Sequence, residues 1–341
     1  MDTHIVPAYR GYTPMTTISL FDASYFGPRR PAWHHLGQLN SNPVSARDAF
    51  QQAGPYDVTL TPAEEPEKWK IRRGRTASDA CIRIFGRVGR EFVLVPPDEL
   101  TELWDLNVSK PVETLGALWS GKCLFITTIL EPIDVRGDAL DNYLVLAHWM
   151  TPDARTEVFE APVRVVCQNT LMMAQRKASE RIVMTPGPDV RDRMAESLTH
   201  AVRAAQERTG ILRAQCEALA DRRATAEDTV SVLEAAFPAD PTRRAATMEL
   251  FEGAGTGMHT PAARGTLWGL YNAIAELENF REGDTLKQAA ASVLFGERGA
   301  AIERAFDAAL RCCFQSIEHV DGDLTGDVST SSMKVRATSR V

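Results

Sequence analysis

The sequence predicts an α+β protein: an antiparallel sheet packed by helices, followed by a mainly helical C-terminal region. Apolar or alternating residues form a block of strand-like segments at 123–130, 142–150, 156–159 and 163–167. A helix-forming segment follows at once, which completes a strand–strand–strand–helix core. Strands that come in a block, and not one per helix, favour an antiparallel sheet over a wound parallel one. After residue 186 the composition turns helical.

Four regions follow from these patterns. We expect an N-terminal arm at 1–30, an α+β core domain at 31–186, a helical region packed on the core at 187–320, and a disordered Ser/Thr/Gly-rich tail at 321–341. The chain of 341 residues is long enough to bury a substantial core.

The first half of the chain carries clear start and stop signals. Ser45 and Asp48 form a capping-box pattern that predicts a short helix ending at Gly54. Asp98 is expected to cap another helix. Four strands are predicted before Pro96, at 57–61, 68–73, 80–85 and 91–95. A hairpin turn is expected between the last two strands, at 86–89. A second short helix is expected at 111–119, just before the large strands.

The second half reads as a series of helices. A stripe from Val190 to Leu219 recurs every three, four or seven residues and predicts one long amphipathic helix. Thr225 caps the next helix, and Thr266, after Gly265, opens a later one. Further expectations are an inward face made of Val230, Leu233 and Phe237, a loop at 238–244, a hinge or turn at 253–257, and a last helix near 299–317.

Several classes of function find no support in the residue pattern. Six cysteines lack CxxC spacing and the histidines lack zinc-ligand spacing, so we expect no metal and no cofactor. No apolar run reaches the roughly 20 residues that span a bilayer. The N-terminal residues lack the basic and apolar regions of a secretory signal. These features predict a cytoplasmic protein with no membrane partner.

Positive charge is concentrated between residues 68 and 90, although the chain as a whole carries a net charge of −7. This segment has eight basic residues against one acid, interleaved with Trp69 and Phe85. Such a pattern is typical of a nucleic-acid groove, and equally of a solvated hairpin with charged outer faces. The basic residues are Lys68, Lys70, Arg72, Arg73, Arg75, Arg83, Arg87 and Arg90.

A second candidate site is the corner at 162–178, where an extended segment breaks into a helix. Arg164 lies in an otherwise apolar strand and must find a partner or line a groove. Asn169 lies at the corner, where unpaired helix N-terminal amides can hold an anion such as phosphate. Cys167 fits a core position better than a nucleophile, because residues 164 and 167 face opposite sides of a strand.

Three motifs carry a resemblance to a known family, and they span about residues 30–285. The chain resembles the phage/plasmid-like protein family that is built on domain-of-unknown-function 932. The resemblance implies a mobile-element context in a bacterial host cell and no established reaction. The motif residues are Trp33, His34 and Gly37, then Arg164, Cys167, Asn169 and Thr170, and last Gly265, Thr266, Trp268 and Asn272.

The strand–strand–strand–helix block is similar to the core of the single-strand annealing recombinases, which form rings or filaments. This similarity implies a homo-oligomer that binds or anneals single-stranded DNA in recombination or replication. Such a protein needs a basic groove that follows the phosphates. The residues expected to supply it are Lys68, Lys70, Arg72, Arg73, Arg75, Lys122, Arg164, Asn169, Arg176 and Lys177.

Two alternatives stay open. The first is an enzyme or nucleotide-binding protein with a pocket at the 164–170 corner, where Arg164 would clamp an anion. No acid–base pair accompanies that corner, so no catalytic residue is assigned and a non-enzyme is favoured. The second alternative is a non-catalytic interaction module that uses the long helix.

Overall fold

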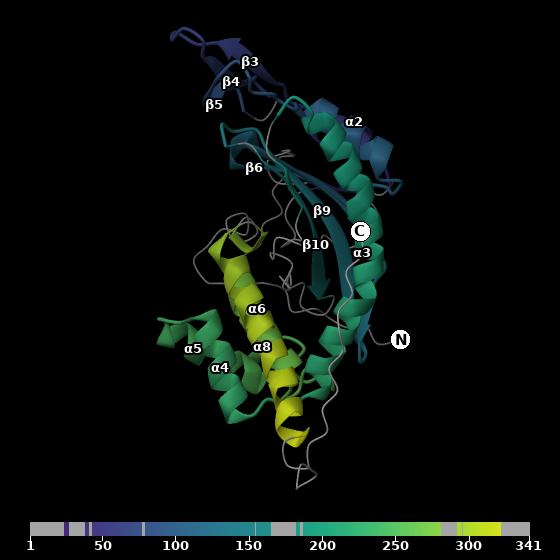
Figure 1. Ribbon diagram of the computed structural model, residues 1–341, viewed down its shortest axis with the longest axis vertical. Coiled ribbons are helices and arrows are strands. Elements are labelled where there is room, and N and C mark those ends of the chain that lie inside the picture. The colour runs from purple at the N-terminus through teal and green to yellow at the C-terminus, as the bar shows by residue number, and fades with distance from the viewer. Residues whose placement is uncertain are drawn as a thin grey trace, which may run out of the picture.

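The predicted fold class is confirmed: the chain is an α+β protein whose C-terminal part is helical (Figure 1). The structure is a computed structural model. It describes residues 24–26, 38–40, 43–76, 79–153, 155–164, 182–184, 187–280, 292–294 and 296–321. The predicted tail after 321 and most of the predicted arm lie outside these ranges.

The larger sheet has the strand order β11-β10-β9-β7-β6-β1-β2, with β8 paired to β9. Every described pair in it is antiparallel except β1 with β2, which is parallel. Its strands are β1 (Ser24–Phe26), β2 (Gln38–Asn40), β6 (Thr114–Leu118), β7 (Cys123–Ile129), β8 (Ile133–Val135), β9 (Asp138–Trp149), β10 (Thr156–Arg164) and β11 (Ile182–Met184).

Two predictions about this sheet are wrong. The helix expected at 111–119 is strand β6, whose five residues are all buried and pair with β7. The helix-forming leucine and alanine of this segment are overridden by tertiary burial. The strands expected at 156–159 and 163–167 are one strand, β10, which continues through Pro162. In the described residues β11 pairs with β10 over 156–158 alone, so Pro162 lies on an edge, where proline is tolerated.

A smaller antiparallel sheet of β3 (Val58–Pro62), β4 (Trp69–Arg73) and β5 (Arg83–Val88) lies at the top of Figure 1. The turn predicted at 86–89 and the strand predicted at 91–95 are wrong, because Gly86 and its neighbours continue β5. Gly86 lies beside a bulge in the pairing of β4 with β5. A Cβ at Gly86 would come within 2.2 Å of Cγ of Pro152, so glycine serves a close approach here and not a turn.

The helices begin largely where the capping signals place them. Ser45, Thr225 and Thr266 each accept a hydrogen bond from the backbone N–H three residues on, which confirms three predicted helix starts. The helical segments are α1 (Ala46–Ala53), α2 (Pro97–Asn107), η2 (Trp119–Gly121), α3 (Val190–Asp221), α4 (Ala226–Ala236), α5 (Pro241–Glu249), η3 (Leu250–Ala254), α6 (Leu267–Asn279) and α8 (Glu297–Asp321).

Three details of the helices differ from expectation. Pro96, and not Asp98, occupies the cap position of α2. Pro97 follows at the first helical position, where proline suits the start of a helix because its φ is already fixed and no N–H is needed. Val230 is 56% exposed, whereas Leu233 and Phe237 are buried as predicted. The loop expected at 238–244 is shortened by α5, which begins at Pro241.

Two hydrophobic clusters make up the described core. The first contains residues of α1, α2 and the smaller sheet together with Leu124, Leu146 and the first half of α3. The second contains Phe125, Val145 and their neighbours on the larger sheet, and it continues through the second half of α3 into α4, α6 and α8. Because Leu124 and Phe125 are adjacent in one strand, the two clusters lie on opposite faces of the larger sheet.

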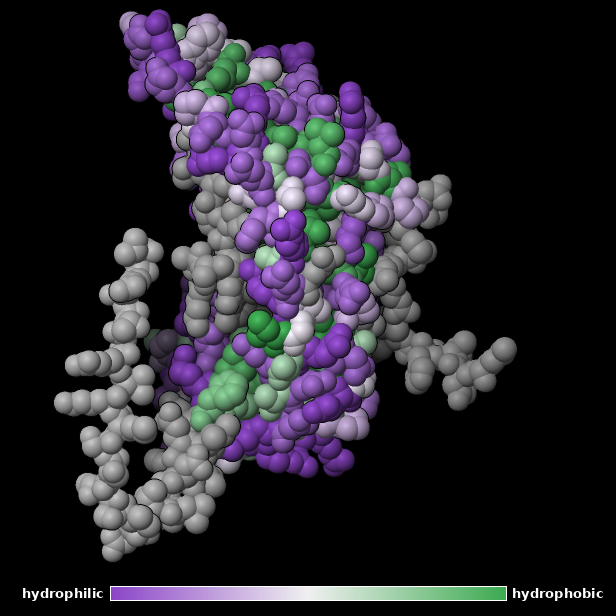
Figure 2. Space-filling view, turned by 45° about the vertical axis from the view of Figure 1, so that its right-hand side comes forward, coloured by the Kyte–Doolittle hydropathy of each residue, from purple (hydrophilic) through white to green (hydrophobic). Residues whose placement is uncertain are grey.

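On the face shown in Figure 2, the coloured surface is mostly hydrophilic with scattered hydrophobic patches. Among the described residues, no helix is both long enough and apolar enough to cross a membrane.

Candidate nucleic-acid interface

The predicted binding residues fall into four groups. The smaller sheet carries Lys68 to Arg75, and the connection from β6 to β7 carries Lys122. Arg164 ends β10, opposite Leu140, and only its backbone is described. The other predicted binding residues, Asn169, Arg176 and Lys177, lie outside the described residues, as do five motif residues: Trp33, His34, Gly37, Cys167 and Thr170.

Arg73 faces the interior and is a correction to the predicted interface. Its side chain is fully buried, forms an ion pair with Asp79, and donates from Nη2 to the backbone oxygen of Cys81 at 3.2 Å. A fully buried guanidinium that is paired with a carboxylate inside the fold cannot contact a phosphate outside it. Arg73 is therefore a structural residue that joins the end of β4 to the connection that precedes β5.

Asp79 is the acceptor that organises this segment. Its carboxylate accepts from the backbone N–H of Cys81 at 3.0 Å and from Nε of Arg83 at 3.1 Å, in addition to Arg73. These interactions, the Cys81 hydrogen bond above all, lower the pKa of Asp79 to about 2. The carboxylate is therefore ionised at any pH near neutrality and neutralises part of the positive charge on β4 and β5.

Acids just before the basic segment neutralise more of it. Glu64 forms an ion pair with Lys70, which lowers the pKa of the Glu64 carboxyl. Arg87 donates from Nη1 to Glu65 at 2.9 Å. Another pair joins Nε of Arg90 to Glu67 at 2.6 Å. For these basic residues, the interpretation as a solvated hairpin with charged outer faces is favoured over a nucleic-acid groove.

Three cations of the smaller sheet remain. Within the described residues, no carboxylate lies within 4 Å of the side-chain nitrogens of Lys68, Arg72 or Arg75. Arg72 lies on the outer face of β4, directly opposite Thr59 on β3 and Ile84 on β5, and Lys68 and Arg75 are exposed. These side chains can reach a phosphate without breaking an ion pair of the described fold.

Of the aromatic residues of the basic segment, one is buried and the other is partly buried. Phe85 is buried in the first hydrophobic cluster and Trp69 packs against it. The expected interleaving of aromatic and basic side chains along 68–90 is therefore not a stacking surface.

An exposed aromatic side chain comes instead from the connection between β6 and β7. Trp119 is 45% exposed and stacks on Trp149 of β9, with 6.5 Å between ring centroids and 28° between ring planes. The guanidinium carbon of Arg155 lies 4.5 Å from the centroid of the Trp149 ring. Lys122 is exposed in the same connection. Sequence reasoning missed Trp119 because it placed this residue at the end of a helix.

Two contacts bring this connection beside the smaller sheet. The hydroxyl of Tyr56, which leads into β3, donates to the backbone oxygen of Gly121 at 3.3 Å. Pro152, between β9 and β10, packs against Gly86 of β5. The smaller sheet and both connections therefore meet at the upper end of the larger sheet in Figure 1. The smaller sheet with its flanks and these two connections carry six side chains that we call the cationic end: Lys68, Arg72, Arg75, Trp119, Lys122 and Arg155.

Acidic side chains also lie at the cationic end. Arg155 forms an ion pair with Glu157 at 2.9 Å. The pKa of Asp153 is lowered mainly by a hydrogen bond from Thr151, with smaller contributions from Arg155 and Lys122. The positive charge of this end is therefore local, and it rests most strongly on the three cations of the smaller sheet.

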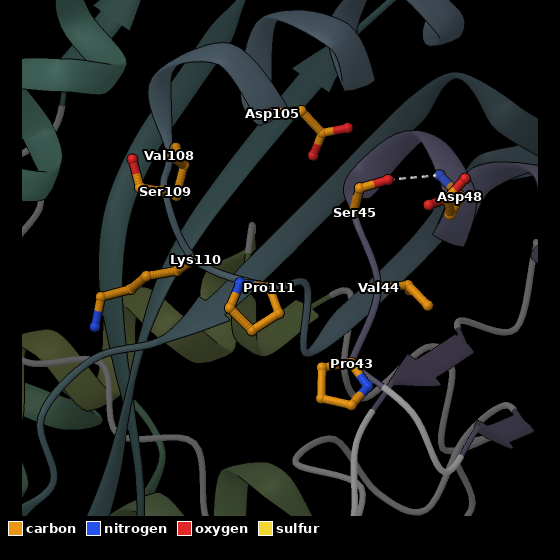
Figure 3. A pocket seen from close by; sticks show the side chains of 9 residues that line it. All are labelled: Pro43, Val44, Ser45, Asp48, Asp105, Val108, Ser109, Lys110 and Pro111. Atoms are coloured by element: carbon orange, nitrogen blue, oxygen red, sulfur yellow. Dashed lines mark hydrogen bonds between the residues drawn. The ribbon is translucent and has the colours of Figure 1, made fainter.

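A shallow pocket of about 450 Å³ lies elsewhere, between the start of α1 and the segment from α2 to β6 (Figure 3). The carboxylate of Asp105 accepts from the backbone N–H groups of Ala46 at 2.6 Å and Arg47 at 3.0 Å. Ser45 Oγ accepts from the N–H of Asp48 at 3.1 Å. The chain's own groups thus fill the anion position at this helix start, which makes the pocket a poor phosphate site.

The third motif has a structural role. Gly265 adopts φ 67°, a left-handed conformation that favours glycine, and Thr266 caps α6. Trp268 donates from Nε1 to the buried carboxylate of Asp138 at 2.8 Å. Asn272 donates from Nδ2 to the backbone oxygen of Trp268 at 2.8 Å. These residues fix α6 against the start of β9.

Comparison with known proteins places the chain in a family. A family model described as "Domain of unknown function (DUF932)" matches residues 84–292, more than half of the chain. The chain belongs to this family. The DUF932 region begins within β5, so it includes Trp119, Lys122 and Arg155 but not Lys68, Arg72 or Arg75. No curated protein and no solved structure matches the chain.

Proposed function

We propose that this chain binds single-stranded DNA at the cationic end, and that it serves as a phage- or plasmid-encoded annealing protein in recombination or replication. The observation that carries the proposal is the set of Lys68, Arg72 and Arg75, which have no carboxylate within 4 Å in the described fold. The resemblance of the sequence pattern to single-strand annealing recombinases, which comes from the sequence alone, points to the same function.

The net charge of −7 is compatible with this proposal. At physiological ionic strength the Debye length is about 8 Å, so distant exposed acids are largely screened. A phosphate at the smaller sheet therefore interacts mainly with the cations beside it. Three acids that flank the strands of that sheet, Glu64, Glu65 and Asp79, are already paired with other basic residues.

Binding should depend on salt in proportion to the number of phosphates contacted. For single strands the slope of log K against log salt is about −0.7 per phosphate. If Lys68, Arg72, Arg75 and Lys122 each contact one phosphate, the slope is about −3. Replacing Arg72 and Arg75 together by alanine should make it shallower by about 1.4.

The test is fluorescence anisotropy with a labelled oligo-dT across a series of salt concentrations. The control is Arg213→Ala with Arg311→Ala, which removes the same charge from exposed positions on α3 and α8. We expect the Arg72/Arg75 variant to weaken binding and flatten the slope, and the control to do neither. Absence of binding by folded wild-type protein at low salt would overturn the proposal, and so would an equal loss in the control.

Annealing further requires a homo-oligomer, which we propose forms through β5. In the described residues β5 is an edge of the smaller sheet, and Ile82 and Ile84 are 44% and 50% exposed there. An edge strand with exposed aliphatic side chains is suited to pairing with another copy. Light-scattering masses that stay monomeric with and without oligo-dT would contradict annealing, while leaving DNA binding intact.

A further inference from the structure

We propose that Trp119 is a stacking platform for a nucleobase, so that the turn between β6 and β7 holds a base while the nearby cations hold phosphates. This inference rests on the proposed function and deepens it. It assigns base contact to the DUF932 region and phosphate contact largely to β4 and its flanks, which precede that region.

Trp119 is partly exposed, and its ring is supported by a second tryptophan. Trp119 is 45% exposed, whereas Trp149 beneath it is nearly buried and carries the Arg155 guanidinium against its ring at 4.5 Å. Backbone hydrogen bonds fix the chain on both sides of the stack. The N–H of Trp149 donates to the backbone oxygen of Arg155 at 2.9 Å, and the N–H of Met150 donates to the backbone oxygen of Lys122 at 2.7 Å. Because the Trp119 ring is already held by a rigid support, little side-chain entropy is lost when a nucleobase stacks on it.

The backbone of the turn holds Trp119 in an unusual conformation. Trp119, Ser120 and Gly121 have consecutive φ values of 51°, 60° and 90°. The left-handed region is unfavourable for a bulky side chain such as tryptophan, and turns that need it ordinarily use Gly or Asn. Residues kept in sparsely populated conformations cluster at ligand-binding sites. The conformation of this partly exposed tryptophan therefore supports a role in binding a ligand.

Charge around the ring indicates which stacking ligand fits. Tryptophan also stacks on sugar rings, but a neutral sugar gains nothing from nearby cations. Lys122 lies three residues from Trp119 in the same turn, and the Tyr56–Gly121 hydrogen bond joins that turn to the smaller sheet. A polyanion with flat bases matches both features, so single-stranded DNA is favoured over an oligosaccharide.

The experiment compares two oligomers of equal length and charge, oligo-dT and an abasic oligomer, with the full chain. Stacking on one aromatic ring should favour oligo-dT by about 5- to 100-fold. Trp119→Ala should remove this preference and leave binding of the abasic oligomer and its salt slope unchanged. Trp119→Phe should retain most of the preference, and it guards against a folding defect in the alanine variant. The matched control is Ile211→Ala, an exposed apolar residue on α3.

A second readout is tryptophan emission. Oligo-dT should quench the wild-type protein more than the Trp119→Phe variant, and the abasic oligomer should quench neither. Equal wild-type affinity for the two oligomers would overturn the stacking inference but leave the proposed function standing. An equal loss on both oligomers in Trp119→Ala would also overturn stacking. Failure of the wild type to bind either oligomer would overturn both proposals, as would binding of an oligosaccharide alone.

Discussion

Nε1 of Trp268 and Oδ2 of Asp138 lie 2.8 Å apart, and this buried hydrogen bond joins the start of α6 to the start of β9. Residues far apart in the chain are thereby held in fixed register. A hydrogen bond to a carboxylate contributes more than one between neutral groups.

Trp268→Phe should reduce the free energy of unfolding by about 2–4 kcal/mol, because it removes this donor and leaves a small cavity. Urea denaturation provides the measurement. A double-mutant cycle with Asp138→Ala should give a coupling energy of about 1.5–3 kcal/mol. Additive effects of the two substitutions would show that the hydrogen bond contributes nothing.

Arg72 and Arg73 are neighbours on β4 with opposite environments. Arg73→Met removes the buried partner of Asp79 and should cost about 2–4 kcal/mol, somewhat below a fully buried pair because Asp79 also bonds to Arg83 and Cys81. Arg72→Met, the matched control, should change stability by less than about 0.5 kcal/mol. Thermal or urea unfolding distinguishes the two, and equal effects would contradict the assigned faces.

His148 should make the fold sensitive to acid. It is buried, its ring nitrogens contact Thr156 Oγ1 at 2.8 Å and the oxygen of Val95 at 3.1 Å, and burial lowers its pKa from 6.5 to about 4. The unfolded chain therefore takes up a proton first as the pH falls.

Stability should fall between pH 6.5 and pH 4, by about 3 kcal/mol in total at 1.36 kcal/mol per pKa unit. Urea unfolding across this range measures the loss. In His148→Gln the part of the pH slope due to this residue should disappear. An unchanged slope in that variant would assign the acid sensitivity to other groups.

Two glycines should respond to alanine in opposite directions. A Cβ at Gly269, in the first turn of α6, would lie 1.8 Å from the backbone oxygen of Ala263, so Gly269→Ala must displace the helix. We expect a loss of about 2 kcal/mol or more. Gly210 lies within α3 with nothing near its Cβ position, so Gly210→Ala should stabilise by about 0.5–1 kcal/mol. Melting temperatures that shift in the same direction would contradict this.

The acids before β4 should restrain DNA binding. Replacing Glu64 and Glu65 together by glutamine releases Lys70 and Arg87 from their ion pairs. Affinity for oligo-dT should rise and its salt slope steepen by about 1.4, for two added phosphate contacts. Stability should change little, because exposed ion pairs contribute about 0–1 kcal/mol each. Weaker binding by this variant would place the DNA away from the smaller sheet.

The fold class, the helix starts at Ser45, Thr225 and Thr266, and the stripe of α3 are predictable because their signals are local. The segment 111–119 is misread because its helix-forming residues are buried in a sheet, which a local propensity does not reveal. Gly86 is misread as a turn because its contact is with Pro152, distant in sequence.

The candidate site is predictable in part for similar reasons. Strand alternation indicates that Arg72 and Arg73 face opposite sides, but only the packed structure identifies the inner one. The pairing of Lys70 and Arg87 with Glu64 and Glu65 depends on strand register. Trp119 is recognisable once β6 and β7 are known to be joined by a tight connection.

Helix α3 is uninterrupted from Val190 to Asp221, with its first half in one hydrophobic cluster and its second half in the other. The two clusters also cover opposite faces of the same strands, so loss of order on one face of the larger sheet removes support from the other. The two clusters should therefore unfold as one cooperative unit, despite the change in composition near residue 186. A ligand that binds near the smaller sheet should then slow amide hydrogen exchange as far away as α6 and α8.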